Sequence, residues 1–301
     1  MASLQAHLAA FVIRRQIRRR LGRMDDLGQV KAVFEGAKLP APSGVRFRPD
    51  TLGGVPGEWA ESESAATSTL LYLHGGGFIA CSPRTHRPIT GWFAKHGFRV
   101  FAPDYRLAPE HPFPAAVEDA VASWRALREA VDGPAVVAGD SAGGNLSLAM
   151  MLALRDAGDA RPAAAALFSP ATDLAGTGES YQTNARRDAM FPGEDLKHLG
   201  QAYLGSTDPR TPLASPLYAD LAGLPPLVIH VGEREVLRDD SVRLAERARA
   251  AGVHVDLVVW PVVPHVWQLA HATVPEARRS LQAAAAFLHR AADASGSAAR
   301  V

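Results

Sequence analysis

The sequence has little of what several classes of protein require. It contains a single cysteine, Cys81, among 301 residues, which excludes an internal disulfide framework and favours a small buried hydrophobe at that position. Its 32 basic and 31 acidic residues leave a net charge of +1, so no global field draws the protein to nucleic acid. The cysteine–histidine spacings typical of metal sites are missing, and we expect neither a metal nor an organic cofactor.

Long hydrophobic runs are missing as well, including at the N-terminus. The first apolar stretch is too short to span a bilayer and has arginines after it, the reverse of a secretory signal, so we expect a cytoplasmic protein. This segment has apolar residues at helical spacing, namely Leu4, Leu8, Phe11, Ile13, Ile17, Leu21 and Met24. Arginines surround the second half, namely Arg14, Arg15, Arg18, Arg19, Arg20 and Arg23. The pattern favours a helix packed on the protein with a solvated basic face; the alternative is reversible contact with an anionic membrane surface.

From about residue 40 the chain alternates between short β-type runs and helical stretches. Several of the runs are almost continuously apolar, as strands buried on both faces are. They begin near Gly44, Thr69, Arg99, Ala135, Ala165, Leu227 and Val253. The alternation predicts an α/β protein whose mostly parallel central sheet is covered by helices on both faces.

Two regions depart from this alternation. One is residues 1–40, and the other is residues 173–224, a long polar and helical insertion between two core strands. Insertions of this length are commonly lids. We therefore expect both regions to form a helical cap over the carboxyl ends of the strands, with residues 41–172 and 225–301 forming the core.

The strongest local signal is GDSAG, residues 139–143, which lies between an expected strand and an expected helix. It matches G-x-S-x-G, in which the serine occupies a strained turn and the flanking glycines relieve crowding. The following helix N-terminus stabilises negative charge near the hydroxyl. A serine that merely caps the helix would give a similar pattern, but the order of strand, turn and helix favours Ser141 as a nucleophile.

A second glycine-rich segment, HGGGF at residues 74–78, also ends an expected strand. A phosphate-binding loop would continue with Lys-Ser/Thr and a helix, which this segment does not. Consecutive glycines let backbone N–H groups approach a ligand oxygen, and such a loop accompanies the serine turn as the oxyanion hole of lipases and esterases. Together the two segments predict acyl-transfer chemistry.

Five segments taken in order resemble the hormone-sensitive-lipase-like esterases: HGGGF, DYRLAPEHPFPAA, GDSAGG, SPATDL and PHVWQL. GGVPGEWA, residues 53–60, resembles a bacterial branch that includes acetyl hydrolases and a monoterpene ε-lactone hydrolase. The resemblance implies the α/β-hydrolase fold and a serine carboxylesterase. It also implies that the backbone N–H groups of Gly76, Gly77 and Ala142 form the oxyanion hole, and that Asp104 and Arg106 support the glycine loop.

The general base should be a histidine near the carboxyl ends of the strands, after the serine and the acid in chain order. Of the eleven histidines, His265 lies in the loop after the last expected strand, and it matches the family's histidine. We therefore interpret His265 as the base that takes the proton from Ser141.

The acid of the triad is expected in GEREVLRDD, residues 232–240. Asp239 and Asp240 abut a helix start, where capping and the macrodipole favour acidic residues. Glu233 has no evident role. Glu235 overlays the position of the family's acid, although a glutamate stands where aspartate is commoner, so we predict Glu235 as the acid with Asp239 as the alternative.

These residues predict hydrolysis of short- to medium-chain acyl esters through an acyl-enzyme. An ε-lactone hydrolase using the same triad is the first alternative, and a ligand-binding protein on a hydrolase scaffold is disfavoured because Ser141 and His265 are both present. Candidate pocket residues, each of which could equally be core, are Met190, Phe191, Tyr203 and Trp267. Relatives dimerise through the last strand, which implies a homodimer.

Overall fold

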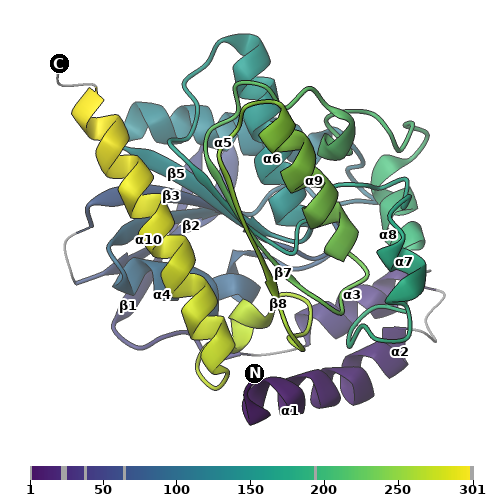
Figure 1. Cartoon of the computed structure of the whole chain (residues 1–301). Coiled ribbons are helices and arrows are strands. Elements are labelled where there is room, and N and C mark those ends of the chain that lie inside the picture. The colour runs from purple at the N-terminus through teal and green to yellow at the C-terminus, as the bar shows by residue number, and fades with distance from the viewer. Residues whose placement is uncertain (1, 22–25, 37–38, 64–65, 193–194, 299–301) are drawn as a thin grey trace.

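The computed structural model describes residues 2–21, 26–36, 39–63, 66–192 and 195–298; Arg23 and Met24 of the predicted N-terminal helix lie outside this part. Within it, eight strands form one sheet in the order β1-β2-β4-β3-β5-β6-β7-β8. They are β1 (Val45–Leu52), β2 (Val55–Ser62), β3 (Ser68–Leu73), β4 (Phe98–Pro103), β5 (Ala135–Asp140), β6 (Ala165–Phe168), β7 (Leu227–Gly232) and β8 (Val255–Trp260). Pairing is antiparallel at β1–β2 and β2–β4 and parallel from β4 to β8, so the expected mostly parallel sheet is confirmed (Figure 1).

Helices cover both faces of the sheet (Figure 1). Side chains along a strand alternate between the two faces. Thus Leu70 and Tyr72 of β3 pack with α4 (Arg87–Lys95) and α10 (Pro275–Ala298). Leu71 and Leu73 pack on the other face with α5 (Ala115–Ala130), α6 (Ala142–Ala157) and α9 (Arg238–Ala250). This two-sided burial explains why the parallel strands are continuously apolar.

β2 is the strand that the pattern of apolar runs did not predict. Its sequence contains Pro56 and Gly57, two residues that are depleted in strands. Both lie near the outer part of the sheet, between β1 and β4. A Cβ at Gly57 would overlap the ring of Phe101 on β4, so glycine permits the close approach of these two strands.

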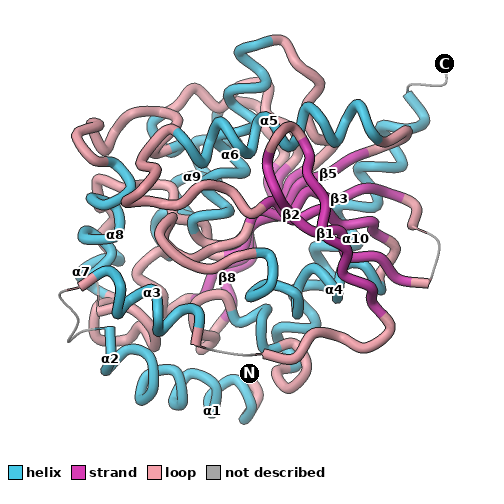
Figure 2. Tube along the Cα trace, turned by 180° about the vertical axis from the view of Figure 1, so that it is seen from behind, coloured by secondary structure: helices cyan, strands magenta, loops and turns pink. Residues whose placement is uncertain are grey.

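The N-terminal segment and the 173–224 insertion lie side by side in both views (Figures 1 and 2). The first contains α1 (Leu4–Ile13), the π-helical η1 (Arg14–Arg18), α2 (Arg19–Leu21) and α3 (Leu27–Glu35); the second contains α7 (Ser180–Thr183), α8 (Asp195–Leu204) and the 3₁₀ turn η3 (Pro216–Tyr218). Two further 3₁₀ turns are η2 (Pro83–His86) and η4 (Trp267–Ala270).

One arginine joins these two segments. The Arg18 guanidinium donates hydrogen bonds of 2.7 to 2.8 Å to the carbonyl oxygens of Ala185, Asp188 and Phe191. The contact supports the idea of a joint cap, whose boundaries at residues 40, 173 and 224 stay a prediction. Among the described residues, no helix combines the length and the apolar composition of a membrane span.

The expected packing of the N-terminal helix is wrong in its first half. Leu4, Leu8 and Phe11 are 82%, 60% and 56% exposed, whereas Ala6 and Leu21 are buried. Alanine on the inner side allows α1 to approach the body closely, and the larger apolar side chains of its first three turns point outward.

Candidate active site

The turn between β5 and α6 presents Ser141. This residue has φ 53° and ψ −118°, a conformation that costs a non-glycine residue free energy. A Cβ at Gly143 would overlap the carbonyl oxygen of Leu73, so only glycine lets the helix start this close to β3. The Ser141 N–H donates to the Phe168 carbonyl at 2.8 Å, which ties the turn to β6.

The carboxyl ends of β7 and β8 bring Glu235 and His265 together. His265 Nδ1 lies 2.6 Å from Glu235 Oε2, and both side chains are buried. The other carboxylate oxygen, Oε1, accepts hydrogen bonds from Gly232 N–H at 2.6 Å and Ser169 Oγ–H at 2.8 Å. Burial alone would lower the pKa of His265, but the hydrogen bond and charge of Glu235 outweigh it and raise the pKa above its ordinary value.

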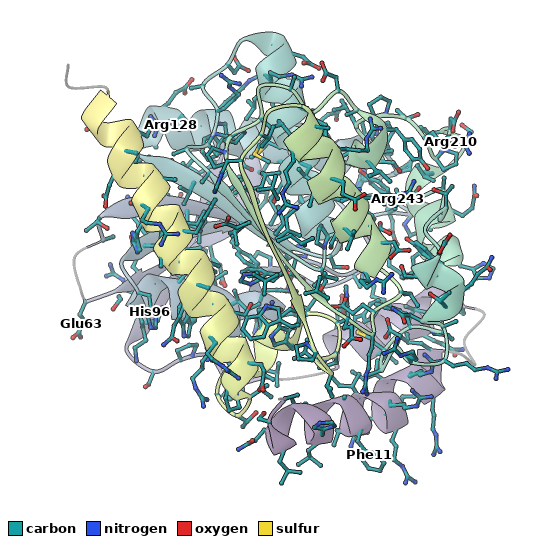
Figure 3. All side chains as sticks on the ribbon, in the orientation of Figure 1. Phe11, Glu63, His96, Arg128, Arg210 and Arg243 are labelled. Carbon is teal, nitrogen blue, oxygen red and sulfur yellow. The ribbon has the colours of Figure 1, made fainter. Side chains whose placement is uncertain are left out.

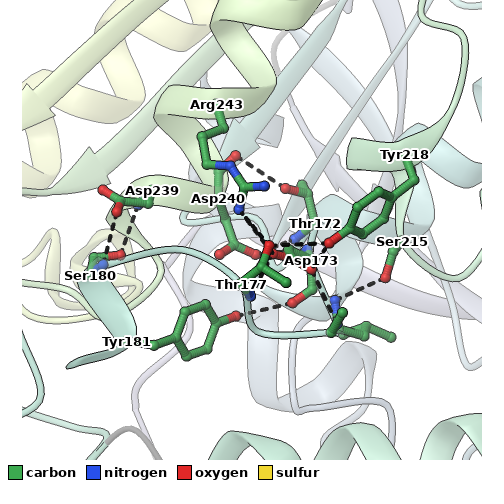
Figure 4. A network of polar contacts seen from close by, with 12 residues as sticks. Thr172, Asp173, Thr177, Ser180, Tyr181, Ser215, Tyr218, Asp239, Asp240 and Arg243 are labelled. Atoms are coloured by element: carbon green, nitrogen blue, oxygen red, sulfur yellow. Dashed lines mark hydrogen bonds and ion pairs between the residues drawn. The ribbon is translucent and has the colours of Figure 1, made fainter. Parts of the chain in front are cut away.

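The other carboxylates of this turn make different contacts. Two of these residues, Asp239 and Asp240, are labelled in Figure 4. Asp239 accepts a hydrogen bond from Ser180 N–H and pairs with Arg238. Asp240 accepts from the N–H groups of Thr172 and Asp173, and burial raises its pKa to about 8. Glu233 is half-exposed. Among the described residues 232–240, Glu235 is therefore the carboxylate whose position supports the role of triad acid.

The glycine loop, residues 74–78, lies against a cavity that Ser141 and His265 also line. Gly76 and Gly77 have φ 124° and 63°, and both line this cavity with Ser141 and Ala142. A Cβ at Gly76 would overlap the carbonyl oxygen of Ala80, so the loop's shape requires glycine there. The predicted oxyanion donors are thus adjacent to the predicted nucleophile.

The support of the glycine loop differs in detail from the expectation. Tyr105, between the two residues predicted for this role, donates from its hydroxyl to the His74 carbonyl at 2.7 Å and stacks on the His74 ring. Arg106 instead ties its own segment, the loop after β4, to α5, because its guanidinium donates hydrogen bonds to the Asp119 carboxylate. Asp104 contributes its N–H, which donates to the Pro56 carbonyl on β2.

Comparisons with known proteins identify the family of this chain. Residues 70–269 match a family described as having the alpha/beta hydrolase fold. The chain belongs to this family. An acetyl-hydrolase of Streptomyces hygroscopicus is 46% identical over 244 residues, which cover 80% of this chain and 82% of the relative. An esterase of Acinetobacter venetianus is 36% identical, with 83% and 84% covered.

Solved structures give the same result. The crystal structure of an esterase from the bacterial hormone-sensitive lipase family is 40% identical, has a TM-score of 0.88 and covers 96% of this chain and 99% of that one. A hormone-sensitive lipase from a metagenome library is 38% identical, has a TM-score of 0.88 and covers 95% of this chain and 98% of that one. The resemblance noted in the sequence is confirmed, and the protein is a carboxylic ester hydrolase of this family.

The cavity of the hydrolase is about 280 Å³ and is lined mainly by apolar side chains from both the core and the helical segments. Met190, Phe191 and Trp267 line it. Tyr203 does not: it is fully buried and its ring stacks on Phe78 with centroids 3.8 Å apart. The N-terminal segment, which the sequence predicted as part of the cap, supplies a further wall whose residues were not predicted: Ala9, Ile13, Ile17, Val33, Phe34 and Leu39.

Asp188 is a buried residue of the insertion that sequence reasoning missed. Its Oδ1 accepts from the N–H groups of Met190 and Phe191, and its Oδ2 accepts from Val236 N–H at 2.8 Å. It therefore connects the pocket wall to the turn that carries Glu235. Burial and the charge of Glu235 raise the pKa of Asp188. No motif surrounds it, so the sequence offered no signal.

Asp140, directly before Ser141, was also missed. It is fully buried and accepts a hydrogen bond from Tyr72 O–H at 2.6 Å, and His86 Nε2 lies 3.3 Å from its carboxylate. Burial would raise the pKa of Asp140, but the contacts with His86 and Tyr72 lower it. Its carboxylate fills the space that a Cβ of Gly75 would need, so it packs directly beneath the glycine loop.

Proposed function

We propose that the hydrolase is a serine carboxylesterase that cleaves short- to medium-chain acyl esters through an acyl-enzyme, with Ser141, Glu235 and His265 as its triad. The observation that supports this most strongly is the 2.6 Å contact between Glu235 Oε2 and His265 Nδ1 beside the cavity that Ser141 lines. A glutamate can replace aspartate in such a triad. Here its two anchoring hydrogen bonds hold the longer side chain in one orientation.

The proposed reaction has two halves. In the first, His265 Nε2 removes the proton of the Ser141 hydroxyl, whose oxygen bonds to the ester carbonyl carbon. The carbonyl oxygen becomes an oxyanion that accepts hydrogen bonds from the N–H groups of Gly76, Gly77 and Ala142. The C–O bond to the alcohol then breaks, and His265 gives its proton to the departing alkoxide oxygen, leaving an acyl-enzyme.

In the second half, His265 removes a proton from water, whose oxygen attacks the acyl carbon. Collapse of the second tetrahedral intermediate releases the carboxylic acid and returns the proton to Ser141. Glu235 fixes the tautomer of His265 with Nδ1–H directed at its carboxylate and stabilises the imidazolium. The chain supplies the nucleophile, the base and the oxyanion donors of these steps, and solvent supplies the water.

The substrate class is proposed from the cavity. Its apolar walls, including Phe191 and Trp267, suit an acyl chain, and a volume of about 280 Å³ favours short to medium lengths over long ones. Two further proposals concern partners. A homodimer would use the edge strand β8, where Val258 and Val259 are exposed. The basic N-terminal helix would contact an anionic surface.

A substrate panel tests the proposed function. Purified protein should hydrolyse nitrophenyl esters of short and medium acyl chains faster than long ones, and Ser141→Ala should lower kcat by at least about 10⁴-fold. ε-Lactones belong in the same panel. A lactone preferred over every linear ester would replace the substrate class, and undiminished hydrolysis by Ser141→Ala would overturn the nucleophile.

A further inference from the structure

A second, smaller pocket lies where the N-terminal helix meets the insertion and the loops after β7 and β8. Its volume is about 160 Å³. Four of its lining residues carry or can carry positive charge: His7, Arg14, Arg187 and Arg234. The other lining residues are Ala10, Phe11, Ala189, Val262 and Val263, so the described lining contains no carboxylate.

The cations of this pocket are incompletely neutralised. Arg187 lies 3.4 Å from Glu233, whose side chain is half-exposed. Arg14 donates one hydrogen bond to the Arg186 carbonyl. Neither Arg14 nor Arg234 forms an ion pair with a described carboxylate, and the buried Nε of Arg234 has no hydrogen-bond partner in the described part of the chain. Buried donors without partners are costly, and an anion with several acceptor oxygens would satisfy them.

An exposed apolar stripe adjoins the pocket on the same helix. Leu4, Leu8 and Phe11 recur at spacings of four and three residues and are all more than half exposed. Figure 3 shows Phe11 on the outer side of α1, directed away from the body. Phe11 also lines the pocket, and the Arg15 guanidinium lies 5.6 Å from its ring centroid. A cationic pocket and an apolar stripe thus share one residue.

The opposite side of the N-terminal helix faces the active-site cavity. Ala9, Ile13 and Ile17 line that cavity, and on a helix of 3.6 residues per turn they lie roughly opposite the stripe. A layer of apolar material against the stripe would therefore lie about one helix diameter, roughly 10 Å, from the acyl-binding cavity.

We propose that this surface binds a bilayer containing anionic phospholipids, with a headgroup phosphate in the pocket and Leu4, Leu8 and Phe11 among the acyl chains. An apolar stripe alone does not identify its partner, but the charge does. Residues 1–24 contain no acidic residue, and Arg15, Arg19 and Arg20 extend the positive surface beyond the pocket. Amphipathic helices with arginine beside leucine and phenylalanine bind anionic lipid surfaces in this way.

A second copy of the chain fits this surface less well. In a symmetric dimer the same patch meets itself, so the arginines of both copies would approach one another. Like charges at a contact oppose association. The proposal is independent of the catalytic roles given above, because binding to vesicles is measured without turnover and with Ser141→Ala as readily as with the unmodified protein.

Co-sedimentation with vesicles tests the proposal, using phosphatidylcholine alone against phosphatidylcholine mixed with phosphatidylglycerol. The full chain should bind the mixed vesicles several-fold more strongly, and salt should weaken the binding. Leu8→Ser with Phe11→Ser should lower binding at least about tenfold. Arg234→Gln and Arg14→Gln should each lower it about fivefold. Hydrolysis of a water-soluble acetyl ester, unchanged in each variant, shows that the fold is retained.

Matched controls lie elsewhere on the surface. Arg290→Gln on α10 removes an exposed cation, and Val258→Ser on β8 removes an exposed apolar side chain; both should bind like the unmodified protein. Equal binding to both vesicle types overturns the proposal. If Leu8→Ser with Phe11→Ser lowers vesicle binding but Arg234→Gln and Arg14→Gln do not, the pocket does not hold the lipid headgroup. Stabilisation by inorganic phosphate without vesicle binding assigns the pocket to a free anion, and a dimer abolished by Phe11→Ser assigns the stripe to a second copy.

Discussion

Two regions of the hydrolase meet at the active-site cavity, and they are held in place by different means. In the core, Ser141 directly follows β5, whereas Glu235 and His265 lie three and five residues after β7 and β8, in short loops that the paired ends of these strands carry. The helical segments reach the cavity through loops that side chains hold, notably Arg18 and Asp188. Substitutions of the core residues should therefore abolish hydrolysis, whereas substitutions in the helical segments should lower its rate or change its selectivity by smaller factors.

The largest effect is expected at Glu235, the proposed acid of the triad. Glu235→Gln keeps the size of the side chain but removes its charge and its preference for one His265 tautomer, so kcat should fall by about 10⁴-fold. Circular dichroism should show a folded protein. Asp239→Asn is the matched control, because Asp239 contacts Ser180 and Arg238 rather than the histidine, and its kcat should stay within a few-fold. A greater loss with Asp239→Asn would make Asp239 the acid.

A smaller effect is expected where a helical segment touches the core. Asp188→Asn replaces one carboxylate oxygen by an NH₂ group that cannot accept a hydrogen bond, so either the bond from Val236 N–H or the two from Met190 and Phe191 N–H are lost. We expect kcat to fall about 10- to 100-fold, with a smaller change in KM, because the Glu235 turn shifts. Asp208→Asn, an exposed position of the same insertion, should be neutral. A fall in stability with normal kcat would limit Asp188 to a structural role.

The pH dependence connects the two regions. As the proposed base, His265 must be unprotonated, and Glu235, together with Asp188, raises its pKa. Activity should therefore be lost as pH falls through a value above about 6.5, the ordinary pKa of histidine. In Asp188→Asn one negative charge near the imidazole is gone, so the acid limb of kcat/KM should move to lower pH. A limb that moves upward would contradict this electrostatic coupling.

The smallest effects are expected at two aromatic residues, Phe191 in the cavity wall and Tyr203 in the core. Phe191→Ala widens the cavity and should change the relative kcat/KM for different acyl lengths about tenfold. Tyr203→Phe should leave that preference unchanged. Its buried hydroxyl has no hydrogen-bond partner among the described residues, so removing it should leave the free energy of unfolding equal or up to about 1 kcal/mol higher. Altered chain-length selectivity in Tyr203→Phe would place this residue in the pocket after all.

The same division explains what could be predicted from the sequence. The fold was predictable because buried parallel strands are continuous apolar runs, and glycine-rich turns follow two of them. β2 could not be recognised, since Pro56 and Gly57 interrupt its pattern and its pairing depends on β1 and β4. The exposure of Leu8 and Phe11 was also unpredictable, because helical periodicity identifies a face but not the side on which the body lies.

The site shows a similar limit. Chain order, position after a strand and the resemblance to the family's motifs indicated His265 and Glu235, and the structure places their side chains in contact. Asp188 lies in a segment without periodicity or motif, and its three partners are set by tertiary structure alone. Tyr203 was a candidate for the pocket but lies in the core. The sequence of an insertion does not show whether an aromatic side chain faces a ligand or the core.

The Arg18 contact has a consequence for how the chain is made. Its guanidinium and the three carbonyl groups that it binds are 167 to 173 residues apart in sequence. At a synthesis rate of about 5–20 residues per second, roughly 8 to 35 s pass between the appearance of the arginine and that of its partners. Until those partners are made, the N-terminal segment cannot form this contact. The wall that this segment contributes to the active-site cavity is therefore completed only after residue 191 has been synthesised.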